Sequence, residues 1–111
     1  MAQVTLMPNT STIATGTGTL VGTATTQINL QFVPETGVGF SNGTVKIESS
    51  TAPNPGANDW FSIATLIFSA HMTTLDINLY LVNNPWIRAN VSLTDPTGLI
   101  GGSISIYMGY N

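Results

Sequence analysis

The chain has 111 residues, the size of a single domain, and contains no cysteine, which excludes a disulfide framework and cysteine-based metal sites. Only 6% of its residues are charged, where a typical soluble domain has about 25%. Its formal net charge is −3, and Lys46 and Arg88 are its only basic residues, so it lacks the basic stripe of a nucleic-acid-binding protein. Threonine, serine, asparagine and glutamine supply most of its polarity. Because these side chains cost less to bury than charged ones, the composition favours a permanent assembly.

The first 25 residues are rich in threonine and glycine. Residues 3–7 predict a short strand with Val4 and Leu6 pointing inward. Threonine favours extended backbone and glycine weakens it, so we expect residues 1–25 to form an arm or an edge strand that needs a partner. A loosely ordered terminus is the alternative. The stretch MAQVTLMPNTST also lacks the basic and apolar regions of a secretory signal peptide.

Residues 26–111 predict one antiparallel β-sandwich domain. Apolar and polar residues alternate in several short runs, which is the period of half-buried strands. Glycine, proline and asparagine separate the runs at intervals of about 8–12 residues. The fold class we expect is all-β and jelly-roll-like, with about seven or eight strands and no substantial helix. The expected strands of this domain are Thr26–Val33, Gly43–Ser50, Asp59–Ser69, Asp76–Leu81, Trp86–Leu93 and Ser103–Met108.

The expected strand Asp59–Ser69 is apolar on both faces. One face carries Trp60, Ala64, Leu66 and Phe68, and the other carries Phe61, Ile63 and Ile67. Such a strand is either central to the sandwich or covered by a neighbouring chain. Its apolar stretch is too short and too interrupted to span a bilayer, so we expect no membrane partner.

The two runs Asp76–Leu81 and Trp86–Leu93 flank an Asn-Asn-Pro turn and predict a hairpin. Matching inward faces favours a three-residue loop over residues 83–85, which places Tyr80 beside Arg88. The outward residues then form one patch, and Tyr107 points outward from the last strand. We interpret this set as a protein interface, since tryptophan, tyrosine and arginine are enriched there. The predicted interface or ligand face comprises Tyr80, Trp86, Arg88, Asn90 and Tyr107.

Two alternatives to that interpretation remain. Trp86 and Tyr80 could stack on sugar rings while Asn90 binds their hydroxyls, as in a carbohydrate-binding module that attaches to a host. Alternatively, Trp86 caps the core and Arg88 pairs with Asp76 or with a backbone carbonyl.

No residue pattern points to catalysis or to a cofactor. His71 is the only histidine, the five acidic residues are dispersed, and the chain has no Gly-x-Ser-x-Gly motif. Asp59 with Asn58 and Asn54 could hold calcium, but a turn-forming role is favoured for all three. We therefore predict no enzyme activity, no catalytic residues, no cofactor and no metal site.

Part of the chain resembles small β-sandwich proteins of tailed-bacteriophage virions. Those proteins share a strand reading G-T-V-x-[IL]-E-x-S, an Asn/Asp-Trp strand, a [WY]-[IV]-R-A-x-[VL] strand and a final G-G-[ST]-[IV]-[ST]-[IV] strand. The matching segments here are GTVKIESS from Gly43, Asp59-Trp60, WIRANV from Trp86 and GGSISI from Gly101.

The resemblance covers residues 43–108, and it implies a structural role in the virion as a capsid decoration, neck, tail or fibre component. The partners we expect are copies of the chain, as a trimer, and other virion proteins. The first 25 residues have no counterpart in the pattern and could reach toward a neighbour.

Overall fold

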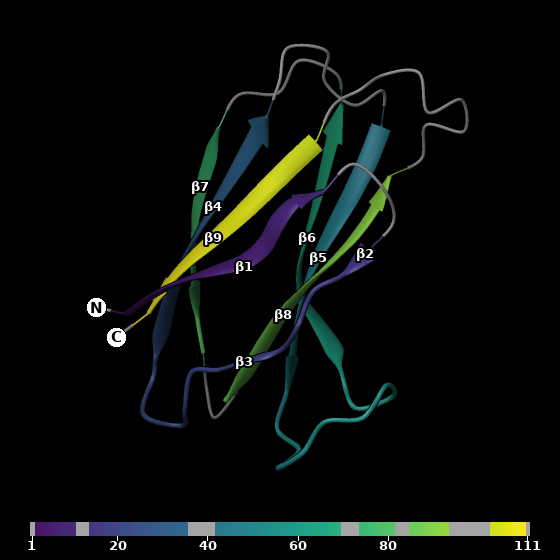
Figure 1. Ribbon diagram of the computed structural model, residues 1–111. Helices are drawn as coiled ribbons and strands as arrows, with labels where there is room; N and C mark the ends of the chain where they lie inside the picture. Colours follow the sequence, from purple (N-terminus) through teal and green to yellow (C-terminus); the bar gives the residue numbers. More distant parts are fainter. Residues whose placement is uncertain are drawn as a thin grey trace.

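A computed structural model describes residues 2–10, 14–35, 42–69, 74–81, 85–93 and 103–110. In these segments the chain is all-β, with no helix (Figure 1). Its strands are β1 (Ala2–Thr10), β2 (Ala14–Thr15), β3 (Thr19–Leu20), β4 (Gln27–Glu35), β5 (Asn42–Ser50), β6 (Phe61–Ser69), β7 (Leu75–Tyr80), β8 (Trp86–Leu93) and β9 (Ser103–Tyr110).

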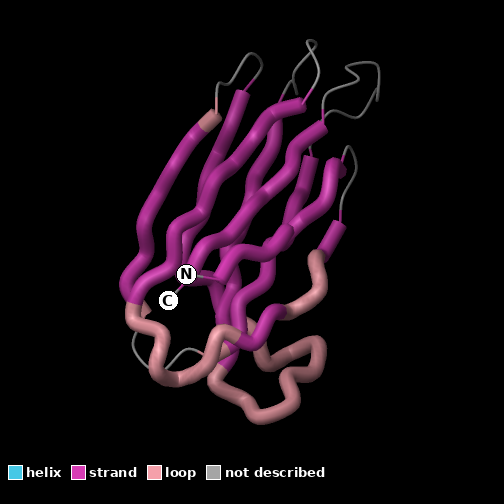
Figure 2. The backbone as a smooth tube through the Cα atoms, turned by 60° about the vertical axis from the view of Figure 1, so that its left-hand side comes forward, coloured by secondary structure: helices cyan, strands magenta, loops and turns pink. Residues whose placement is uncertain are grey.

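The strands form two antiparallel sheets that pack face to face (Figure 2). Sheet A has the order β1-β9-β4-β7, and sheet B has the order β2-β8-β5-β6. The two-residue strands β2 and β3 both pair with β8, at successive positions, and together take the place of one interrupted strand. Each sheet thus contains strands from both the N-terminal and the C-terminal part of the chain, which is the arrangement of a jelly roll. The predicted fold class is confirmed.

The core lies between the sheets and follows the predicted alternation. Each central strand contributes every second residue, and these side chains are almost completely buried because one face of each strand points into the sandwich. In β1 a register shift between Thr5 and Met7 turns two successive residues, Leu6 and Met7, inward. The core side chains of the four central strands are Ile28, Leu30, Phe32, Val45, Ile47, Ile87, Ala89, Val91, Ile104, Ile106 and Met108.

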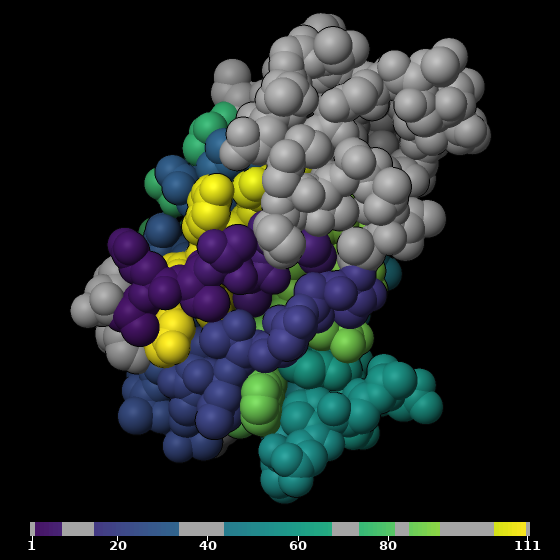
Figure 3. Space-filling view, in the orientation of Figure 1, coloured from purple at the N-terminus to yellow at the C-terminus, as the bar shows by residue number. Residues whose placement is uncertain are grey.

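Strands β1, β2 and β3 close one side of the sandwich. β1 pairs with β9 at the edge of sheet A, and β2 and β3 pair with β8 at the edge of sheet B. Gly16 lies between the sheets, where its N–H donates a hydrogen bond of 2.8 Å to the carbonyl oxygen of Ala89. Figure 3 views the molecule from this side, where residues 2–7 and 15–25 run across the surface. We call it the closed side.

The opposite side of the sandwich is bounded by β6 and β7, and we call it the open side. Each of these strands pairs with a single neighbour, β6 with β5 and β7 with β4. Their core-facing residues are only partly buried, in contrast to Leu6 and Met7 on the closed side. These half-buried residues are Ile63, Ala64 and Leu66 on β6 and Leu75, Ile77 and Leu79 on β7.

The position of β6 excludes one of the two predictions made for this strand. It is an edge strand, so the prediction of a central strand is wrong, and cover by a neighbouring chain stays a prediction. A register shift opposite Ile47 and Glu48 turns Ile63 toward the core together with Ala64. Ile67 keeps the predicted outward direction, and the side chain of Phe68 lies outside the described residues.

The predicted hairpin between the runs 76–81 and 86–93 is wrong. β7 lies in sheet A beside β4, whereas β8 lies in sheet B between β5 and the short strands β2 and β3. Face alternation constrains which side chains point inward, but both sheets of a sandwich satisfy the same alternation. The connection therefore crosses from one sheet to the other, and its residues 82–84 lie outside the described residues.

Candidate interaction site

The outer face of sheet B holds three of the predicted site residues. Trp86, Arg88 and Asn90 alternate along β8 with buried residues, so all three project away from the core. Arg88 lies opposite Glu48 of β5, and Asn90 lies opposite Lys46. β8 therefore brings these residues into one line, as predicted, but with β5 as the neighbouring strand.

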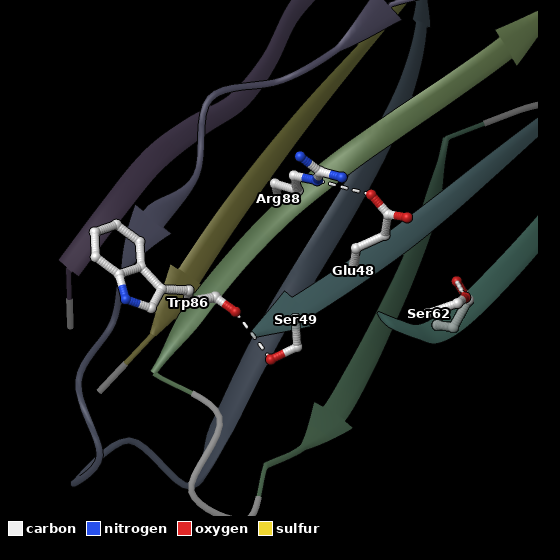
Figure 4. Close-up of polar contacts among 6 residues, drawn as sticks. Glu48, Ser49, Ser62, Trp86 and Arg88 are labelled. Atoms are coloured by element: carbon white, nitrogen blue, oxygen red, sulfur yellow. Dashed lines mark hydrogen bonds and ion pairs between the residues drawn. The ribbon is translucent and has the colours of Figure 1, made fainter. Parts of the chain in front are cut away.

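Arg88 is held on two sides by this chain. Its Nε donates a hydrogen bond of 2.7 Å to Oε1 of Glu48 (Figure 4), and its guanidinium carbon lies 4.4 Å from the centroid of the Trp60 ring. The two charged side chains are only 17% and 13% exposed. A guanidinium over an indole face gains a cation–π attraction in addition to the ion pair. Glu48 therefore takes the place of Asp76 or a backbone carbonyl, the partners expected for Arg88 within the chain, and contact of this residue with another protein stays a prediction.

Trp60 and Trp86 line a shallow pocket of about 270 Å³ together with Gly18, Asn54 and Pro55. A Cβ added to Gly18 would lie 2.8 Å from Cη2 of Trp60, so only glycine allows the backbone to approach this ring. Below the pocket, the Ser49 hydroxyl donates a hydrogen bond of 2.9 Å to the carbonyl oxygen of Trp86 (Figure 4). The first contact packs Trp60 against its own chain, and the second fixes the main chain of β8 at Trp86.

Tyr80 and Tyr107 lie on the other sheet. They project from the outer face of sheet A, on β7 and β9 respectively, and Tyr80 is 81% exposed. The expected single patch of Tyr80 with Trp86, Arg88 and Asn90 is therefore not formed. The sugar-binding arrangement that depended on Tyr80 beside Trp86 and Asn90 falls with it.

The outer face of sheet A carries a set of amide side chains that sequence reasoning did not single out. Asn29 donates a hydrogen bond of 3.1 Å to Oδ1 of Asn78 across the β4–β7 pair. Gln27 and Gln31 flank Asn29 on the same face of β4. The signal was present in the sequence, since 27, 29 and 31 alternate with buried residues, but a polar outward face is the ordinary pattern of a half-exposed strand.

The loop over residues 51–60 bears on the calcium alternative. Oδ2 of Asp59 accepts a hydrogen bond of 2.7 Å from the N–H of Gly56, and the N–H of Asp59 donates to the carbonyl oxygen of Gly56. Asp59 thus closes a turn. In the described segments no three histidine, cysteine, aspartate or glutamate side chains are grouped to hold a metal ion. His71 and Asp95 lie outside these segments.

The same segments contain no helix long and apolar enough to cross a membrane. Comparison with models of known protein families finds no match, and comparison with curated proteins finds no significant one.

Proposed function

We propose that this chain is a non-enzymatic structural protein of a bacteriophage virion, a capsid decoration or a neck or tail component, that assembles with copies of itself and with other virion proteins. The resemblance of residues 43–108 to virion β-sandwich proteins supports the setting. Jelly rolls serve in viral capsids and also in lectins, so the fold admits this role without selecting it. The observation that carries the proposal is the open side.

Strand β6 has the properties of an edge that another chain covers. Its nine residues, FSIATLIFS, include no charge, proline or glycine. Exposed edge strands normally carry such residues, because a free row of backbone N–H and C=O groups otherwise pairs with other strands. Ile67 on its outer face is 77% exposed and Phe61 is 45% exposed. An added strand would pair these backbone groups and bury this apolar surface.

The other sheet edges in the described structure are protected. β1 contains two register shifts and Pro8, β2 and β3 have two residues each with Gly16 and Gly18 between them, and β7 carries Asp76. Protection by bulges, short strands and charge is how soluble β-proteins avoid edge-to-edge pairing. β6 has only the register shift beside Ile47, near one end. The contrast favours β6 as the assembly edge.

A second copy of the chain suits this edge because an uncharged strand can pair with itself without repulsion. Contact of β6 with β6 around a two-fold axis gives a dimer, whereas the expected trimer requires β6 to meet a different surface of the next copy. In both arrangements the half-buried residues of the open side lose solvent exposure.

Light scattering on the purified chain tests the proposal. We expect an oligomer at micromolar concentration, and we expect Ile67→Lys to weaken its association by about tenfold or more, because lysine must then be desolvated in the contact. Leu20→Lys is the matched control, since Leu20 is an exposed apolar residue at the other edge of the same sheet. A wild-type chain that stays monomeric and does not bind virions, or an equal effect of both substitutions, would refute the proposed role.

A further inference from the structure

The outer face of sheet A is organised in two rows of residues that run across all four strands. Strand pairing aligns β1 with β9, β9 with β4, and β4 with β7. The first row consists of Gln3, Gly109, Asn29 and Asn78. The second row consists of Thr5, Tyr107, Gln31 and Asp76.

A groove of about 430 Å³ lies over the β1, β9 and β4 part of these rows. Gly109 lies between Gln3 and Asn29 and has no side chain to fill the space, while Tyr107 stands beside it on the same strand. The backbone does not require glycine here, since Gly109 is in a regular strand and is not among the glycines with positive φ. The absence of a side chain at Gly109 therefore keeps the groove open.

The polar groups of the groove are available to a ligand. Within the part of the chain that the structure describes, the side chains of Gln3, Gln31 and Tyr107 make no hydrogen bond to the protein. This differs from the outer face of sheet B, where Arg88 is engaged by Glu48 and Trp60. Each glutamine offers two N–H donors and an accepting oxygen, and the tyrosine offers a ring with a hydroxyl at its tip.

We propose that this groove binds a neutral carbohydrate, with a pyranose ring against Tyr107 and its hydroxyls bonded by the amides of Gln3 and Gln31 and by Oδ1 of Asn29, whose Nδ2 is engaged by Asn78. Sugar hydroxyls both donate and accept hydrogen bonds, as amide side chains do, so a few converging amides satisfy several hydroxyls. The apolar C–H face of a pyranose matches an aromatic ring. The volume falls in the range of ordinary small-ligand sites, about 300–1,000 Å³.

The same features disfavour other ligands. The described residues that line the groove include no charged side chain, and the basic residues Lys46 and Arg88 lie on sheet B, so an anionic ligand meets no counter-charge from these residues. A peptide strand would need free backbone groups, but β9 beneath the groove is paired on both sides, with β1 and with β4. A neutral ligand that binds through hydroxyl groups fits both facts.

The proposal is independent of assembly through β6, because none of the described residues that line the groove belongs to β6 or β7. It is tested by NMR titration of the ¹⁵N-labelled full chain with maltotriose, cellotriose and chitotriose, and with sialyllactose as an acidic sugar. We expect at least one neutral trisaccharide to give saturable shifts at the Gly109 and Tyr107 amides, with a dissociation constant on the order of 1 mM, and sialyllactose to bind no more tightly.

Substitutions at three positions of the groove, with one control outside it, locate the site. Gly109→Val should fill the groove and weaken binding about tenfold or more while leaving the strand intact, since β-branched residues suit strands. Gln31→Ala should weaken binding about fivefold, the loss of one or two hydrogen bonds, whereas Gln27→Ala, on the same strand but outside the groove, should not. Tyr107→Phe should retain more affinity than Tyr107→Ala.

Thermal unfolding of each variant verifies that its fold is kept. The proposal is overturned if none of the three neutral trisaccharides binds, if the shifts cluster away from the groove, or if Gly109→Val and Gln27→Ala bind alike.

Discussion

Arg88 is one of two basic residues in the chain, and its charge is used within the protein. Glu48 and Trp60 come from different parts of the sequence, and each contacts one aspect of the guanidinium. The ion pair is mostly shielded from solvent. The attraction between the two charges therefore offsets part of the desolvation cost of each. These contacts join β5, β8 and the loop before β6 on the outer face of sheet B.

We predict that Arg88→Met lowers the free energy of unfolding by about 2 kcal/mol, somewhat less than for a fully buried pair, because the carboxylate of Glu48 loses its partner while remaining largely shielded. The double variant Arg88→Met with Glu48→Met should regain at least half of the loss. Urea denaturation followed by tryptophan fluorescence measures both. Lys46→Met is the matched control at the exposed Lys46 and should change stability by less than about 0.5 kcal/mol. A double variant less stable than Arg88→Met alone would contradict the account.

Gly16 shows how a short element joins two sheets. The added Cβ in Gly16→Ala would lie 2.8 Å from the backbone oxygen of Leu6 and 3.2 Å from Cε of Met7, so β1 must move away from the segment between β2 and β3. We predict a loss of stability of about 2 kcal/mol, as for overpacking in a core, and faster hydrogen exchange of the β1 amides. In Gly56→Ala the nearest atom lies at 3.4 Å, so this variant should unfold close to wild type. Equal unfolding temperatures for the two variants would show that the approach of β1 to the segment between β2 and β3 is not restrictive.

Alternation in the sequence predicts the longer strands well and their partners poorly. The run Thr26–Val33 corresponds to β4, with Ile28, Leu30 and Phe32 buried as predicted. The pairing of β7 with β4 instead of β8 could not be predicted. Alternation shows which side chains of a strand point into the core, but it does not show in which of the two sheets the strand lies. The strands β2 and β3 could not be predicted either. Two residues are too few to show alternation, and both strands form by pairing with β8.

The candidate site follows the same division. That Trp86, Arg88 and Asn90 share an outward face could be derived from β8 alone. Other features depend on the register of strands that are far apart in the chain. They are the contact of Glu48 with Arg88 and the hollow that Gly109 leaves between Gln3 and Asn29. Such contacts are properties of the sheet, so they emerge only when the strands are placed.

For the whole molecule, the two proposed surfaces occupy different parts of the sandwich. The open side lies along β6 and β7, whereas the groove lies over β1, β9 and β4 on the outer face of sheet A. An oligomer built through β6 would leave each groove uncovered by that contact and would present several copies together. Repetition matters for a site of millimolar affinity, since linked sites can raise overall binding by about 100-fold or more.

The combination predicts that assembly changes avidity and leaves the affinity of each groove unaltered. On a surface coated with the trisaccharide that binds best in solution, wild-type protein should dissociate about tenfold more slowly or better than Ile67→Lys, because several grooves must release together. In NMR titrations the two proteins should have the same dissociation constant within about twofold, since Ile67 lies outside the groove. Gly109→Val should lose surface binding while remaining oligomeric by light scattering. If Ile67→Lys weakened the binding of free sugar as strongly as Gly109→Val, the groove would depend on a neighbouring copy, and the two surfaces would not be separate.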